Sequence, residues 1–65
     1  MSHELVTYLL KKVREDIAAV ETSLARGGAK DFAEYRHSCG TVHGLNKTLS
    51  MLLELEKRME IDSDE

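Results

Sequence analysis

Two apolar stripes, separated by a pair of glycines, limit what this chain can fold into. The first stripe is Val6, Leu10, Val13, Ile17, Val20 and Leu24. The second stripe, which includes one serine, is Tyr35, Ser38, Val42, Leu45, Leu49 and Leu52. In both, the spacing alternates between three and four residues, as in the seam between two packed helices. We therefore predict an all-α, antiparallel two-helix hairpin with a coiled-coil-like seam.

The two stripes also match in position when one is read backwards from Gly27-Gly28 and the other forwards. This match pairs Leu24 with Tyr35 at the turn and Val6 with Leu52 at the open end. The residue numbers of every such pair add up to 58 or 59. The sequence thus predicts a specific register, with one layer formed by each pair.

Residues suited to helix ends lie where such a hairpin needs them. Ser2 and Asp31 are good N-caps, and Glu34, three residues after Asp31, resembles a capping box. Gly27 is suited to the left-handed conformation that ends many helices. The chain is expected to be one domain, with a helix over residues 3–26, a turn over 27–30, a helix over 32–60 and an acidic tail over 61–65.

Size and composition favour association over an independent fold. The chain has 65 residues, of which 42% are hydrophobic and 32% charged, and a formal net charge of −3. Two helices share one seam, and chains this small rarely bury enough apolar area to offset the entropy of ordering. A single cysteine cannot form an internal disulfide. We expect a homo-oligomer, as a four-helix or larger bundle.

Apolar residues outside the two stripes predict where a partner would bind. They gather towards the open end of the hairpin, and exposed apolar surface of that extent usually marks an interface. They are Leu5, Tyr8 and Leu9 in the first helix and Met51, Leu53, Leu55, Met59 and Ile61 in the second. A second copy of the chain is favoured over a foreign partner.

Gly40 and Gly44 interrupt the second predicted helix, where each costs about 1 kcal/mol relative to alanine. Their spacing of four places them on one face of the helix. One interpretation is that another backbone packs closely against this face, and the other is that the helix is locally weak. We favour close packing, which would make both glycines interface residues.

Neither a metal site nor a catalytic site is expected. Cys39 and His43 are four residues apart and could share one helix face, but His37 lies about 160° from Cys39 around the helix. A structural zinc site needs four ligands. A two-helix hairpin offers no pocket for a nucleophilic Cys39. We therefore predict no cofactor and no enzyme activity.

Nucleic acid and membranes are weak candidates as partners. Lys11, Lys12 and Arg14 form a small basic cluster, but Glu15 and Asp16 dilute it and no aromatic residue accompanies it. No apolar run approaches the roughly 20 residues that a membrane span requires. The N-terminus has no secretory pattern. A solvated helix face, with Lys11 and Glu15 paired, is the simpler interpretation of the cluster.

Residues 31–45, Asp-Phe-Ala-Glu-Tyr-Arg-His-Ser-Cys-Gly-Thr-Val-His-Gly-Leu, resemble a stretch in short helical proteins of tailed bacteriophages. With the preceding helix and the glycine turn, the resemblance covers most of residues 10–58. The matching positions are Tyr35, Arg36, Cys39, Gly40, Gly44 and Leu45. The resemblance implies a phage origin and a place among virion or assembly proteins, but no catalytic residues.

From these observations we expect a non-enzymatic phage protein that acts through helix-mediated oligomerisation or assembly with another phage protein. It would be found in the host cytoplasm or the virion. The alternative is a small regulator that binds RNA or a host enzyme as a hairpin dimer.

Overall fold

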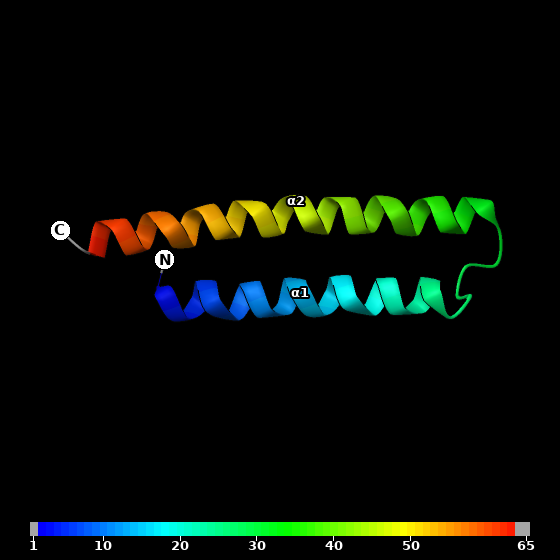
Figure 1. Ribbon diagram of the computed structural model, residues 1–65, viewed down its shortest axis with the longest axis horizontal. Coiled ribbons are helices and arrows are strands. Elements are labelled where there is room, and N and C mark those ends of the chain that lie inside the picture. The colour runs from blue at the N-terminus through cyan, green and yellow to red at the C-terminus, as the bar shows by residue number, and fades with distance from the viewer. Residues whose placement is uncertain (1, 64–65) are drawn as a thin grey trace.

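The computed structural model describes the backbone of residues 2–63 and the side chains of residues 2–60. Two antiparallel helices, α1 (His3–Ala25) and α2 (Phe32–Ser63), are joined by a short loop (Figure 1). This confirms the predicted all-α hairpin. The second helix continues to Ser63, three residues past its predicted end at residue 60. Residues 64 and 65 of that tail, and the side chain of Ile61, lie outside the described part.

The predicted N-caps begin both helices. The Ser2 Oγ accepts a hydrogen bond from the Leu5 backbone N–H at 3.1 Å. The Asp31 Oδ1 accepts one from the Glu34 backbone N–H at 2.8 Å. Each side chain satisfies a helix-end donor that has no partner within the helix. Both helices therefore begin where the sequence predicts.

The glycine pair ends α1 in a Schellman motif. Gly27 has a φ of +78°, the left-handed conformation that residues with a side chain rarely adopt. Its N–H donates to the Leu24 carbonyl at 3.1 Å, and the Gly28 N–H donates to the Ser23 carbonyl at 2.7 Å. A methyl group on Gly28 would lie 2.7 Å from the same Ser23 oxygen. Glycine is thus needed at position 27 for its backbone conformation and at position 28 because a side chain has no space.

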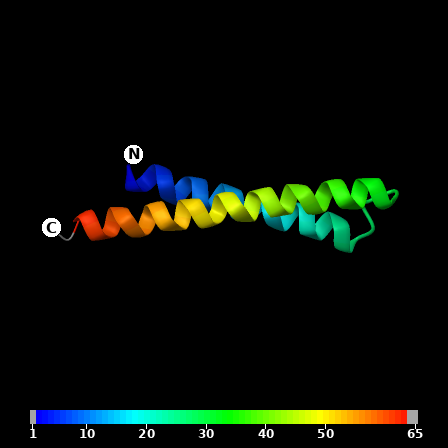
Figure 2. The ribbon, with the colours of Figure 1, turned by 90° about the horizontal axis from the view of Figure 1, so that it is seen from above.

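The two predicted stripes face each other along the hairpin. Among the described residues, the buried hydrophobic side chains are Val6, Leu10 and Ile17, all from the first stripe, and Val6 is fully buried. Every other stripe residue except Tyr35 is half-buried. Seen from above, the helices cross at a shallow angle, as in coiled-coil packing (Figure 2). The predicted seam is therefore present, but it is long and narrow.

The predicted layer between Leu24 and Tyr35 is wrong. With 32 residues against 23, α2 extends past α1 at both ends (Figure 1). The first turn of α2 thus lies beyond the last turn of α1, and Tyr35 is 47% exposed. At the other end Met59, which the predicted pairing would leave beyond α1, is half-buried. Both observations favour a register shifted by one layer.

A cysteine pair tests this shift. In a register shifted by one layer, Val20 faces Val42 and not Ser38, the partner that the sequence predicts. In a Cys39→Ser background, we expect Val20→Cys with Val42→Cys to form an intramolecular disulfide readily under mild oxidation, because only side chains in one layer approach closely enough. Mass spectrometry of the oxidised monomer measures it. Faster closure by Val20→Cys with Ser38→Cys would restore the original register.

Candidate interaction surface

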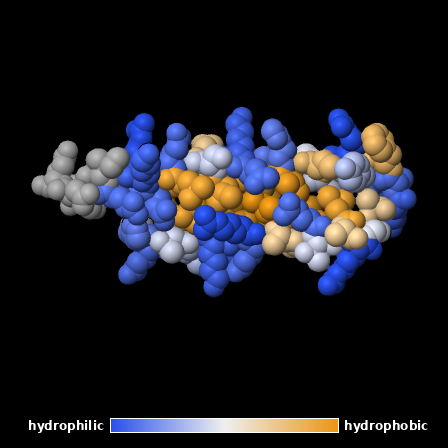
Figure 3. Space-filling view, viewed as in Figure 1, coloured by the Kyte–Doolittle hydropathy of each residue, from blue (hydrophilic) through white to orange (hydrophobic). Residues whose placement is uncertain are grey.

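The outer surface of the hairpin is the place to look for a site. Within the described residues there is no pocket, and no group of three or more His, Cys, Asp or Glu side chains could hold a metal ion. An apolar band instead runs between the two helices, bordered by polar side chains (Figure 3). What this arrangement can do chemically is bind another surface.

Several of the predicted interface residues are exposed. The large hydrophobic side chains that remain exposed are Leu5, Tyr8, Phe32, Tyr35, Met51 and Leu53. Predicted interface residues Leu9, Leu55 and Met59 are half-buried instead. Part of the expected open-end surface is thus already covered within one chain.

Phe32 is the residue that the sequence interpretation missed. It is 73% exposed, more than any other large hydrophobic side chain in the described part. Its ring stacks on Tyr35, with centroids 6.2 Å apart and an interplanar angle of 30°. Phe32 follows the Asp31 cap, and its assignment to the start of the second helix gave no sign that its side chain is exposed. A phenylalanine at that position, outside both stripes, was the available signal.

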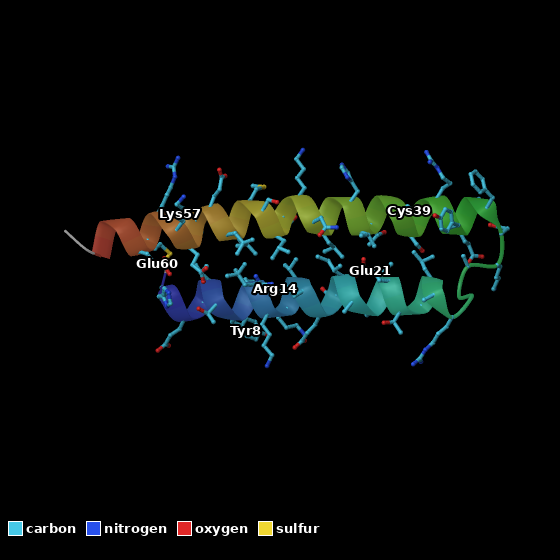
Figure 4. All side chains as sticks on the ribbon, in the orientation of Figure 1. Tyr8, Arg14, Glu21, Cys39, Lys57 and Glu60 are labelled. Carbon is cyan, nitrogen blue, oxygen red and sulfur yellow. The ribbon has the colours of Figure 1, made fainter. Side chains whose placement is uncertain are left out.

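Seven positions form one side of the hairpin, which we call the heptad flank. They recur every seven residues beside the stripes, and in an antiparallel pair these two rows lie on the same side. They are Thr7, Arg14 and Glu21 in α1 and Phe32, Cys39, Asn46 and Leu53 in α2. Figure 4 labels three of them, Arg14, Glu21 and Cys39, which lie along the strip between the two helix axes.

The remaining exposed apolar residues lie elsewhere, near the open end. Leu5 and Tyr8 belong to the outer surface of α1, and Tyr8 points away from α2 in Figure 4. Met51 is 62% exposed on the outer side of α2. We call these three residues together the open-end patch, although they lie on the outer sides of two different helices. The structure therefore divides the predicted interface into two separate surfaces.

The motif residues within 31–45 do not form one site. Tyr35 and Cys39 are one turn apart, and a hydrogen bond with the Cys39 side chain, together with the electrostatic interaction between the two groups, raises the pKa of the Tyr35 hydroxyl. Cys39 is a half-buried free thiol, whereas Arg36 is exposed. Leu45 belongs to the seam and is half-buried. The stretch thus contributes separately to the seam and to the flank.

The histidines stay apart from any ligand cluster. His37 and His43 are both exposed on α2, and Cys39 is half-buried. The His37 carbonyl accepts a hydrogen bond from the Thr41 hydroxyl at 3.2 Å, an ordinary contact within the helix. Nothing in this geometry directs the two imidazoles towards a common point.

Two of the three basic residues in α1 are paired with the same carboxylate. Lys11 and Lys12 lie 4.0 and 3.7 Å from Glu15 oxygens, and all three side chains are exposed. This confirms the predicted Lys11–Glu15 contact. Exposed pairs of this kind contribute little to stability. They do lower the positive charge that a nucleic acid would meet.

Gly40 and Gly44 face open space. A methyl group at either position would meet no atom within 4 Å, apart from the backbone of its own helix. The close packing favoured by the sequence therefore does not occur within one chain. The Gly44 carbonyl also accepts a hydrogen bond from the Thr48 hydroxyl at 3.0 Å, a contact that slightly weakens a helix. Within one hairpin the two glycines only weaken α2, and packing of another chain against them stays a prediction.

Comparison with known proteins gives no relative. No family model, no curated protein and no solved structure matches the chain. Neither described helix is both long and apolar enough to cross a membrane. The exposed surface of the hairpin is therefore the feature that bears on function.

Replacing Gly44 by alanine tests the role of the glycines. Because an added methyl meets open space, Gly44→Ala should stabilise α2 by about 0.5–1 kcal/mol. The measurements are the thermal midpoint and the oligomeric mass, and we expect a higher midpoint with an unchanged mass. Gly28→Ala, whose methyl would meet Ser23, is the matched control and should lower the midpoint. A lower midpoint for Gly44→Ala would show that another chain packs there.

Proposed function

We propose that this chain is a non-enzymatic assembly protein that works by joining helical hairpins into a larger bundle. The observation that carries the proposal is its surface area. The chain exposes 5209 Å², whereas a compact monomer of 7.3 kDa would expose about 4,200 Å². The hairpin thus presents roughly 1,000 Å² more surface than its mass requires.

The shape agrees with the excess area. The radius of gyration is 15.1 Å, against about 10.7 Å for a compact domain of 65 residues. The extents are 52 × 15 × 15 Å, so the molecule is a rod two helices thick. A rod of this kind has no interior beyond its seam. Packing a second pair of helices against it is the simplest way to create one.

The resemblance of residues 31–45 to phage proteins extends this proposal to phage assembly. On that interpretation the chain joins copies of itself to one another and to another phage protein, in the particle or in the infected cell. A mass-spectrometric inventory of purified particles distinguishes these two places. The regulator hypothesis has less support, because Glu15 already pairs with two of the three basic residues that RNA would need.

Sedimentation equilibrium tests the proposal directly. At micromolar concentration we expect a mass of at least two chains, because the seam alone buries too little apolar area to hold a stable fold. Circular dichroism on the same sample should show a helical protein. A helical, cooperatively melting species with the mass of one chain, 7.3 kDa, would contradict the proposal.

A further inference from the structure

We propose that the heptad flank is covered by a second copy of this chain, packed face to face and related by a two-fold axis perpendicular to the helices. This inference rests on the proposed function and specifies which surface carries it. In this arrangement α1 packs antiparallel to its copy, α2 does the same, and the two loops lie at opposite ends of a four-helix bundle.

The apolar content of the flank supports a helical partner. Phe32, Cys39 and Leu53 occupy three of the four heptad positions of the flank on α2, the fourth being Asn46, and the same period builds the seam. Phe32 is 73% exposed, Leu53 is 39% exposed and Cys39 is half-buried. Together with the neighbouring half-buried edge of the seam, they form the kind of apolar band seen in Figure 3. A partner helix with the same period fits such a band along its whole length.

The charges on the flank identify the partner as a second copy. Arg14 and Glu21 lie seven residues apart, or about 10.5 Å along the helix, which is too far for them to pair with each other. Neither has an ion-pair partner among the residues whose side chains are described. An antiparallel copy of α1 presents the same two charges in reverse order. Arg14 of each chain then meets Glu21 of the other, and the axis passes between the two ion pairs.

The area also fits this occupant. A stable interface buries about 800 Å² on each partner, and the hairpin has roughly 1,000 Å² more surface than a compact monomer of its mass. A two-fold axis makes each contact occur twice, so the flank of one chain binds the same flank of the other. No additional surface is needed to close the assembly.

The open-end patch is a less suitable surface for this dimer. Leu5, Tyr8 and Met51 lie near one end of the rod, and Tyr8 points away from the seam. A contact confined to one end would leave Phe32, at the loop end of the flank, and the neighbouring Tyr35 uncovered. A substitution in the open-end patch nevertheless serves as a comparison for one in the flank in the experiment below.

Charge reversal on the flank tests the proposal. Arg14→Glu and Glu21→Arg should each raise the dimer dissociation constant by about tenfold or more, because each places two like-charged pairs at the interface. Combining the two in one chain restores opposite charges and should bring the constant back to within about threefold of the wild type. Sedimentation equilibrium of the full chain measures all three. Lys47→Glu and Glu54→Arg, outside the flank, change the net charge equally and should have little effect.

A second pair of variants separates the two surfaces. Leu53 and Met51 lie on the same turn region of α2, one on the flank and one on the open-end patch. We expect Leu53→Gln to weaken the dimer by about tenfold or more and Met51→Gln to leave it unchanged. Circular dichroism checks that each variant remains helical at a concentration where the wild type is dimeric.

The outcomes distinguish this inference from the proposed function. Rescue by the double charge reversal, together with loss of dimer for Leu53→Gln, supports the flank as the interface. If the charge reversals leave the dimer unchanged, or if Met51→Gln dissociates it, the flank is not the interface. The proposed assembly function would still stand. A stable wild-type monomer overturns both.

Discussion

The seam between α1 and α2 is the interaction on which the rest of the structure depends. It brings two helices together, and the Schellman turn at Gly27 and Gly28 joins them without strain. Yet in the described residues its buried hydrophobic side chains come from α1 alone, at Val6, Leu10 and Ile17. The facing stripe of α2 stays half-buried because no second layer of helices covers it. This incomplete burial explains both the excess surface and the need for a partner.

The middle of α2 depends on the seam more than the rest of the hairpin does. Gly40 and Gly44 lower its helix propensity, and the Thr41 and Thr48 hydroxyls bond back to carbonyls one turn earlier. Such a segment gains its order from packing and not from local preference. The outer face of this segment is open. The partner proposed for the heptad flank would therefore stabilise the segment from the side that lies next to the seam. The weakest part of the helix thus lies next to the proposed interface.

The fold could be predicted from sequence because its determinants are local and periodic. Stripe spacing, the Ser2 and Asp31 caps and the glycine pair each specify one element, and the structure confirms them. The register could not be predicted, since a heptad pattern matches equally well after a shift of one layer. Helix length decides it, through the overhang that exposes Tyr35. Phe32 was missed for a related reason, because exposure beyond the end of α1 depends on that same overhang.

The dependence of thermal stability on concentration tests most directly the claim that one hairpin is half of a folded unit. If association completes the core, dilution must destabilise the fold by mass action. For a chain of 65 residues, a hundredfold increase in concentration should raise the thermal midpoint by on the order of 5–10 °C. The measurement is a circular dichroism melt at several concentrations in the same buffer. A sharp transition whose midpoint does not move with concentration would contradict the claim.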